Sequence, residues 1–423
     1  MDQKTDQAMN QKKVSLFNLA VIVGALGYFV DVYDLLLFSI IRVPSLKSLG
    51  LTQEAVDKQG LDILNLQMIG LLIGGIVWGI LGDKKGRLKV LFASIILYSL
   101  GSIANGFVHT VGQYAVVRFI TGLGLAGELG AGITLVSEIM PKEKRGLGTA
   151  LVAGIGLSGA VFAYFIKVQF GASAEGWRTC YFIGGGLGFL LLLLRIGLLE
   201  SGMYKNIEQS NVRKGDFFML FTSGERLKKY LTAILIALPN WYVIGILISF
   251  SNKFATQMNV KGSVDPGKAI MVAYAAIAVG DVLIGFISQW LKSRKLSLYI
   301  FHIISIIGVL WFFHLQGQDV GMLYWVCVIL GFGTGFWAMF VTMAAEQFGT
   351  NIRATVATTV PNMARGSLNL VSLLFVSLQK YLAPEHAYFQ SGWITGIIVF
   401  VIAFIALIMT KETFGKDLDY IEQ

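Results

Sequence analysis

Long apolar segments are the feature that most restricts how this chain can fold. A helix of about 20 apolar residues crosses the hydrocarbon core of a bilayer, and twelve segments of the 423-residue chain reach this length. Because they are uniformly apolar rather than alternating, they predict helices and not barrel strands. The sequence therefore predicts an all-α integral membrane protein with spans at 15–42, 61–82, 88–107, 111–139, 147–170, 177–198, 229–255, 268–291, 295–314, 320–347, 353–381 and 386–410.

Composition and charge placement agree with a membrane location. Of the residues, 55% are hydrophobic and only 14% charged, whereas a soluble domain carries about 25% charged residues. The 34 Lys and Arg residues, which give a net charge of +9, gather in alternate connections between the spans. This asymmetry predicts both termini in the cytoplasm and accounts for the positive charge without nucleic-acid binding. The first span is too long for a cleaved signal peptide, so we expect a multi-pass protein of the inner (cytoplasmic) membrane.

Two glutamate–arginine motifs occur about half a chain apart. Glu138 stands seven residues before Arg145, and Glu346 stands seven residues before Arg353. Each motif follows one apolar span and precedes the next. Such duplication predicts two copies of one six-helix bundle, an arrangement that transporters use to build a site between the copies. We expect both pairs to latch the cytoplasmic side and to separate when that side opens.

A long polar connection divides the chain between these two copies. Glu200 and Glu412 follow the last span of each copy and form another matched pair of elements. The predicted organisation is a cytoplasmic tail at 1–14, a bundle at 15–198, a cytoplasmic loop at 199–228, a bundle at 229–410 and a cytoplasmic tail at 411–423.

The connection between the second and third spans reads Gly79-Ile-Leu-Gly82-Asp83-Lys84-Lys85-Gly86-Arg87. Its glycines allow a tight reversal, and its charged ends can pair with neighbouring helices. The fourth span contains Arg118-Phe-Ile-Thr-Gly122-Leu-Gly124. With the elements at Glu200 and Glu412, these motifs resemble the major facilitator superfamily over essentially the whole chain. The resemblance implies a twelve-helix transporter whose cytoplasmic gate includes Asp83, Arg87, Glu200 and Glu412.

Two further motifs narrow the resemblance to one branch of this superfamily. Gly27-Tyr-Phe-Val-Asp31-Val-Tyr-Asp34 is similar to the paired acids in the first helix of phosphate, aromatic-acid and metabolite symporters. Gly127-Glu128-Leu-Gly130-Ala131 is most like the fourth-helix motif of metabolite:proton symporters. The chain departs from the family pattern at Gln289, where an acid is expected, and in lacking a proline after Glu200.

Five ionisable residues within predicted spans stand out as candidates for a pathway: Asp31, Asp34, Arg118, Glu128 and Arg365. Each costs about 2.5–3.5 kcal/mol at mid-membrane, so such residues usually mark a pathway. Asp31 and Asp34 share a helix face, and one of two such close carboxyls is expected to hold a proton near neutral pH. Arg118 is expected to reach one of the three acids. We therefore predict proton coupling by these four residues; a static ion network joining the first and fourth spans is the alternative.

Arg365 is the strongest candidate for binding substrate. Its guanidinium cannot lose its charge, and in a water-filled cavity it suits a carboxylate or a phosphate. Asn362 lies on the same helix face, and Pro361 can kink the helix there. The alternative is that Arg365 is an interhelical partner of an acid such as Asp281.

Aromatic and amide side chains near these charges are candidates for the rest of a substrate cavity. They are Tyr28, Asn240, Trp241, Tyr242 and Trp337. Lipid contact or packing is the alternative interpretation. The whole prediction depends on buried ionisable side chains, Asp31, Glu128 and Arg365 above all, facing one central vestibule.

The sequence thus predicts a proton-coupled symporter of a small organic anion, such as a carboxylate metabolite, working by alternating access. A carrier of phosphate or of a neutral or zwitterionic solute (sugar, amino acid or betaine) and a proton-driven exporter remain alternatives. Nothing in the sequence indicates an enzyme, a metal site or a cofactor, and the coupling ion is expected to be H⁺. The expected partners are the substrate and the lipid bilayer, without nucleic acid, around a monomer.

Overall fold

The structure, a computed structural model, describes residues 19–85, 87–128, 145–171, 173–200, 217–384 and 386–416. Helices make up nearly all of these residues, and the described part contains only one isolated bridge, between Lys261 and Asp319. The predicted all-α class is therefore confirmed. Nine helical segments in the described part are long and apolar enough to cross a membrane, and two shorter apolar helices, Lys89–Asn105 and Val111–Leu125, lie in the third and fourth predicted spans. The eleventh predicted span is not among them.

Among the described residues of the N-terminal half (19–85, 87–128, 145–171 and 173–200), one helix lies in each predicted span. These helices are α2 (Leu19–Ser48), α3 (Gln53–Lys85), α4 (Arg87–Asn105), α5 (Val111–Leu125), α7 (Arg145–Phe170) and α8 (Gly176–Glu200). The side chains of Gln113 and Thr110 cap α5 reciprocally, which fixes where this helix begins. Several helices extend beyond the predicted ends, because polar residues continue them past the hydrocarbon core.

The C-terminal half (residues 217–416) is more broken than the sequence predicts. Its elements are η1 (Phe217–Phe221), α9 (Gly224–Ile236), α10 (Leu238–Tyr242), η2 (Val243–Ile248), α11 (Ser251–Gln257), α12 (Pro266–Leu291), α13 (Arg294–Phe313), α14 (Val320–Thr334), α15 (Trp337–Glu346), α16 (Thr350–Gly366), α17 (Leu368–Gln379) and α18 (Ala387–Met409). The helical turn η1 and the first residues of α9 fall within the connection predicted at 199–228, whose bounds stay a prediction.

Three predicted spans, 229–255, 320–347 and 353–381, are thus interrupted helices rather than continuous ones. Pro239 lies at the start of α10, where its missing N–H leaves no hydrogen bond unmade. Gly335 separates α14 from α15. In the eleventh span α16 continues through Pro361, and the interruption comes at Ser367 instead. Interruptions of this kind are tolerated at membrane depth where they line a cavity inside the protein.

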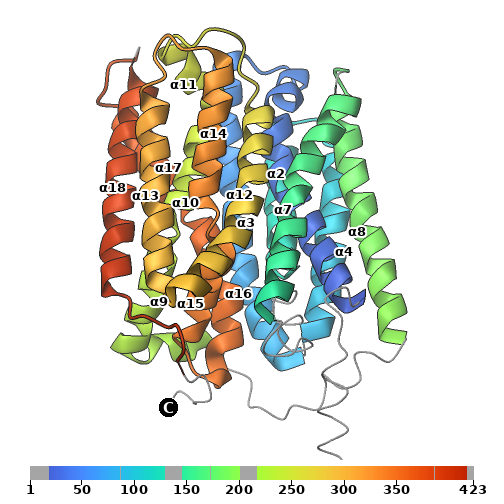
Figure 1. Cartoon of the computed structure of the whole chain (residues 1–423). Coiled ribbons are helices and arrows are strands. Elements are labelled where there is room, and N and C mark those ends of the chain that lie inside the picture. Colours follow the sequence, from blue (N-terminus) through green and yellow to red (C-terminus); the bar gives the residue numbers. More distant parts are fainter. Residues whose placement is uncertain are drawn as a thin grey trace, which may run out of the picture.

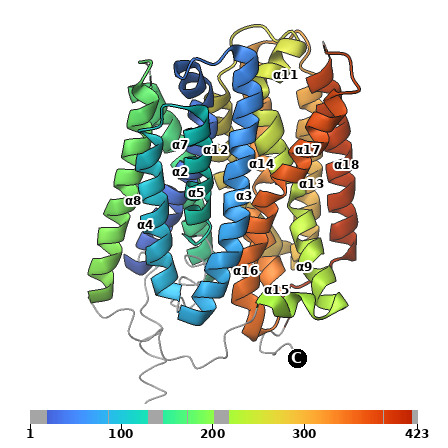
Figure 2. The same ribbon diagram turned by 180° about the vertical axis from the view of Figure 1, so that it is seen from behind.

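The two halves stand side by side (Figures 1 and 2), and two pairs of helices join them. α3 packs against α16, and α7 packs against α12. The first pair joins span 2 of the N-terminal half to span 11, and the second joins span 5 to span 8. Spans 2 and 8 occupy equivalent positions in the two halves, and so do spans 5 and 11. The seam therefore has the symmetry expected of a duplicated bundle.

Ionic and polar contacts across this seam hold together the end of the bundle opposite the C-terminus, here called the upper end (Figure 1). Lys253 Nζ lies 2.5 Å from Asp57 Oδ2, and Lys167 Nζ lies 2.5 Å from Asp265 Oδ2. Arg42 donates to the carbonyl of Ser249 at 2.9 Å. The upper end is therefore closed in this structure.

Large apolar side chains also cover the outside of the bundle. Leu193, Trp290, Leu370 and Ile408 are each more than half exposed. A water-soluble protein rarely exposes contiguous apolar surface on this scale, whereas lipid tails solvate it without cost. The outer surface is thus a lipid-facing surface.

Candidate substrate cavity and buried ion pairs

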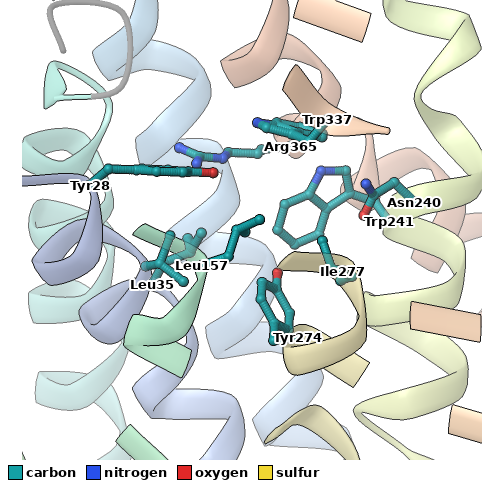
Figure 3. A pocket seen from close by; sticks show the side chains of 10 residues that line it. Tyr28, Leu35, Leu157, Asn240, Trp241, Tyr274, Ile277, Trp337 and Arg365 are labelled. Atoms are coloured by element: carbon teal, nitrogen blue, oxygen red, sulfur yellow. The ribbon is translucent and has the colours of Figure 1, made fainter. Parts of the chain in front are cut away.

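A small cavity lies between the two halves, at the level of the helix interruptions. Figure 3 shows Arg365 and Trp337 on one side, with Tyr28, Trp241 and Tyr274 around them. The space open to the centres of water molecules is about 20 Å³, which suffices for only one or two waters. The lining consists of Tyr28, Val32, Leu35, Leu157, Asn240, Trp241, Tyr274, Ile277, Trp337 and Arg365.

Aromatic rings and unpaired donors give this cavity its chemical character. Trp241 and Trp337 meet edge to face, with ring centroids 6.3 Å apart. The Arg365 guanidinium lies 5.7 Å from the Trp337 ring centroid. Both indole Nε1 atoms and Arg365 Nε are buried without a hydrogen-bond partner in the described part of the protein. Because unpaired buried donors are costly, they favour a ligand rich in acceptor atoms.

Asp31 on α2 faces Arg365 across the seam. Its Oδ2 lies 3.6 Å from Arg365 Nη2, which is an ion pair but too long for a hydrogen bond. Neither oxygen of Asp31 has a hydrogen-bond partner among the described residues, although the side chain is fully buried. Arg365 is therefore an interhelical partner of an acid, as the alternative held, but that acid is Asp31 from the other half of the chain and not Asp281.

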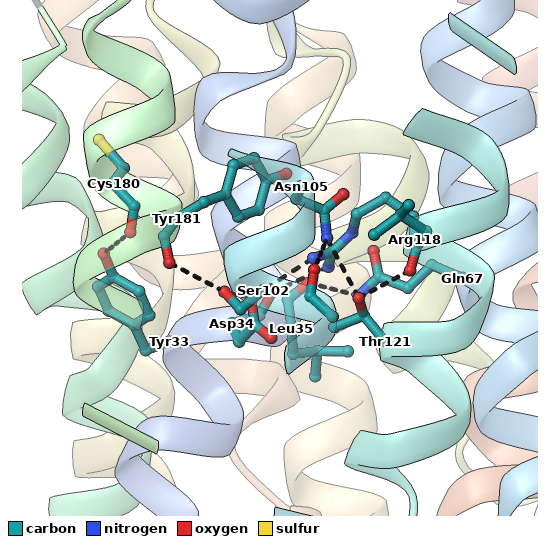
Figure 4. Close-up of polar contacts among 12 residues, drawn as sticks. Tyr33, Asp34, Leu35, Gln67, Ser102, Asn105, Arg118, Thr121, Cys180 and Tyr181 are labelled. Carbon is teal, nitrogen blue, oxygen red and sulfur yellow. Dashed lines mark hydrogen bonds and ion pairs between the residues drawn. The ribbon is translucent and has the colours of Figure 1, made fainter. Parts of the chain in front are cut away.

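Asp34 turns to a different partner, within the N-terminal half. Arg118 Nη1 lies 3.4 Å from Asp34 Oδ1, and its Nη2 donates to the Asp34 carbonyl at 3.0 Å. Ser102 Oγ donates to the same Oδ1 at 3.1 Å (Figure 4). The prediction that Arg118 reaches one of the acids is thus confirmed. The side chains of Asp31 and Asp34 diverge to separate arginines.

Glu128 pairs with an arginine of its own half of the chain and not with a cavity residue. Both of its carboxylate oxygens accept from Arg195 of α8, with 3.0 Å between Arg195 Nη1 and Glu128 Oε2. Both side chains are buried. Gly27 of α2 packs directly against this pair, so a Cβ there would displace the ends of both side chains. The expectation that Glu128 faces a common vestibule is therefore wrong, and its proton-coupling role stays a prediction.

Five of the seven predicted substrate-binding residues line the cavity, and two do not. Tyr242 points toward α18, where its hydroxyl donates to the Gly392 carbonyl at 2.8 Å. It follows Trp241 by one residue, or about 100° around a helix, so the two face different neighbours. Asn362 Nδ2 donates to the Ala126 carbonyl of the other half at 2.9 Å. Asn362 is therefore a contact across the seam.

The predicted gate residues whose side chains the structure describes, Glu346, Arg353 and Glu412, lie at the end that carries the C-terminus, here called the lower end. Glu346 contacts Arg294 at 3.4 Å and accepts from Thr413 at 2.7 Å. Arg353 Nε donates to the Phe348 carbonyl at 3.2 Å. Glu138 and the side chains of Asp83, Arg87, Arg145 and Glu200 lie outside what the structure describes.

Glu412 ties the last connection to α13. It accepts from Ser293 Oγ and from the backbone amides of Arg294 and Phe414, both at 2.9 Å. Partial burial alone would raise the pKa of Glu412, but these donors stabilise the carboxylate and lower the pKa below its usual value.

Three residues in or near the cavity and the buried ion pairs were not predicted as site residues from the sequence. Arg195 stands near the end of an apolar run and was not among the predicted site residues, yet only 4% of it is exposed. Tyr274 lines the cavity but stands in a span of small apolar residues without a neighbouring charge. Asp281 caps the helix that bears Trp337. A single charge in an apolar run was the available signal for Arg195 and Asp281.

Comparisons with known proteins identify the family of this chain. A protein of Bacillus subtilis (strain 168) with the provisional name niacin/nicotinamide transporter is 26% identical over 418 residues, covering 97% of this chain and 99% of its own length. A niacin transporter of Acinetobacter baylyi is 26% identical and covers 96% of both chains. The crystal structure of a D-xylose–proton symporter has the same fold, with a TM-score of 0.69 at 18% identity, over 96% of this chain and 100% of that one. Residues 24–367 match the Major Facilitator Superfamily. The chain therefore belongs to the Major Facilitator Superfamily, as a multi-pass membrane transporter and not an enzyme.

Proposed function

We propose that this chain is a proton-coupled symporter that takes up a small organic anion, preferably a flat aromatic carboxylate. The observation that carries the proposal is the donor set of the cavity: Arg365 with the indole N–H groups of Trp241 and Trp337, all lacking an acceptor at the atoms named above. A carboxylate supplies the acceptors, and an aromatic ring can pack against the indoles once the cavity has enlarged. The relatives named for niacin, a pyridine carboxylate, support this class of substrate.

Proton coupling follows from competition for Arg365. Ionised Asp31 at 3.6 Å partly neutralises the guanidinium and competes with an anionic substrate. When Asp31 takes up a proton, Arg365 is free to bind the substrate carboxylate. The empty Asp31–Arg365 ion pair is neutral, and protonated Asp31 with Arg365 and a bound anion is neutral as well. The two halves can therefore move past the site in either state without burying a net charge. Asp34 with Arg118 provides a second acid at the same depth of the bundle.

Transport requires the cavity to enlarge. A space of about 20 Å³ cannot hold an aromatic acid. We expect the halves to separate at the lower end, taken to be cytoplasmic, while the three upper-end contacts hold. In the other state the upper-end contacts break and the lower end closes. The protein is expected to act as a monomer in the inner membrane, with both termini in the cytoplasm.

Uptake of nicotinate into proteoliposomes with an imposed pH gradient tests this proposal. Asp31→Asn is expected to abolish gradient-driven accumulation, whereas exposed Asp62→Asn serves as a matched control and is expected to behave as wild type. Arg365→Ala is expected to abolish nicotinate binding, and Arg365→Lys to weaken it. Accumulation that survives in Asp31→Asn, Asp34→Asn and Glu128→Gln alike overturns the proton assignment, and unchanged affinity of Arg365→Ala removes this residue from the site.

A neutral substrate is the second candidate, because the Asp31–Arg365 pair already has no net charge. Nicotinate and nicotinamide share a ring and differ in charge, so competition between them separates the two candidates. Preference for nicotinate by tenfold or more supports the anion, and equal or reversed preference supports a neutral solute.

A further inference from the structure

Asp281 of α12 is a buried acid for which the transport mechanism above has no use. Only 2% of the residue is exposed. Its Oδ1 accepts a hydrogen bond from the backbone N–H of Ala338 at 2.9 Å, and its Oδ2 has no hydrogen-bond partner in the described part of the protein. A buried carboxylate aimed at one backbone amide suggests a defined structural task.

That amide belongs to the first turn of α15, where the tenth span restarts after its interruption. The first N–H groups of a helix lack partners within the helix, and a side-chain acceptor from the preceding residue normally satisfies one of them. Phe336, which occupies that position, offers no such acceptor. Asp281 supplies the missing acceptor from a neighbouring helix. Its negative charge also interacts favourably with the positive N-terminal end of the helix dipole.

Close backbone packing makes this cap possible. A Cβ on Gly335 would lie 2.8 Å from Gly280 Cα, and a Cβ on Gly280 would lie 2.7 Å from the Phe332 carbonyl oxygen. Two glycines thus bring the interruption directly against α12, one residue before Asp281. The short aspartate side chain can then reach the helix end.

The capped turn begins with Trp337, the indole that lines the cavity beside Arg365 (Figure 3). Phe336, immediately before it, stacks on His302 of α13 at 4.8 Å between ring centroids. His302 in turn contacts the carbonyl of Ile236, at the interruption between α9 and α10. The position of Trp337 is therefore set by the cap on one side and by a packed aromatic residue on the other.

We propose that Asp281 is a positioning residue that caps α15, holds Trp337 in place as a wall of the cavity, and thereby sets the affinity for aromatic anions. The part that concerns affinity rests on the proposed function; the cap itself does not. Asp281 acts through a helix end and does not need to touch the substrate.

Three variants separate this role from its alternatives. Asp281→Asn retains an oxygen acceptor for the Ala338 amide, whereas Asp281→Ala removes it. Asp319→Ala is the matched control, because Asp319 caps α14 of the same span by accepting from Gly321 N at 2.8 Å, but at the exposed upper end. Each is made in the full chain, with binding of nicotinate and of cyclohexanecarboxylate measured on purified protein.

Asp281→Ala is expected to weaken nicotinate binding about tenfold, the effect of losing one buried hydrogen bond, and to weaken cyclohexanecarboxylate binding less. Asp281→Asn and Asp319→Ala are expected to bind within about threefold of wild type. In a Trp337→Ala background, Asp281→Ala should have no further effect, because the residue acts through that indole. Additive losses, or equal damage by Asp281→Asn and Asp281→Ala, overturn the proposal.

Hydrogen exchange of the α15 backbone gives a readout that needs no substrate. Amides at 337–340 are expected to exchange at least tenfold faster in Asp281→Ala than in wild type, with Asp281→Asn intermediate or unchanged. Unchanged exchange in Asp281→Ala overturns the cap. If wild-type protein binds neither acid while exchange responds as expected, the proposed substrate class has failed and the cap has not.

Discussion

Removing Arg195 alone is the substitution expected to damage this protein most, and it also tests what Glu128 does. In Arg195→Met, Glu128 keeps its charge in a site where its side chain has 0% exposure. Breaking a buried ion pair by removing one partner costs about 3–5 kcal/mol, whereas replacing both partners by apolar residues of similar volume is often neutral or stabilising. We therefore expect Arg195→Met to lose about 3–5 kcal/mol of stability and Glu128→Met/Arg195→Met to recover most of it.

The free energy of unfolding in detergent, measured by denaturant titration for wild type, both single variants and the double variant, gives the coupling between the two side chains. Coupling below about 1 kcal/mol would contradict the pairing seen here. Uptake by the double variant then decides the role of Glu128. If gradient-driven accumulation survives, the pair is a structural contact between α8 and the residues that follow α5. If the folded double variant binds substrate but no longer accumulates it, Glu128 carries the proton.

Other contacts lead to three further predictions. Lys253→Met leaves Asp57 without its cation, so a cysteine placed at Ser249 is expected to react severalfold faster with a membrane-impermeant maleimide; unchanged labelling would show that this contact does not close the upper end. Arg118→Lys keeps the charge but loses the two-pronged contact to Asp34, and we expect at least a tenfold fall in maximal uptake with a small change in KM; wild-type uptake would exclude the geometry as a requirement. The pKa of Glu412 is lowered in the folded protein, so its stabilising contribution is complete above about pH 4.3 and disappears as the pH falls through the lowered value; the melting temperature of wild type, but not of Glu412→Gln, should fall in that range.

Hydropathy predicted the spans because the membrane imposes their length whatever the tertiary contacts are. It missed the interruptions at Gly335 and Ser367, since glycine and serine also occur within continuous membrane helices. Pro361 was the stronger local signal, yet α16 continues through it. Where a membrane helix breaks depends on neighbours that satisfy the freed backbone groups, and Asp281 is such a neighbour.

The candidate site was predicted in its charges more completely than in its geometry. A charged residue within an apolar span is conspicuous in the sequence, and Asp31 and Arg365 do face one another. Spacing alone does not give the rotation of one helix against the next. For this reason Tyr242 was grouped with Trp241, and Glu128 was placed with Asp31 although it pairs with Arg195.

The π-helical segment η2 fixes how the seventh span is rotated. Ser249 N donates to the carbonyl of Ile244, five residues earlier, at 3.1 Å, so this turn accommodates one residue more than an α-helix would. Deleting one residue between Val243 and Ile248 would restore ordinary winding and turn the two ends of the span by about 100° relative to each other. Asn240 and Trp241 would then leave the cavity if the upper end stayed fixed. Insertion or deletion of one residue at this turn can thus change which side chains line the substrate cavity of such a transporter, although no lining residue is itself substituted.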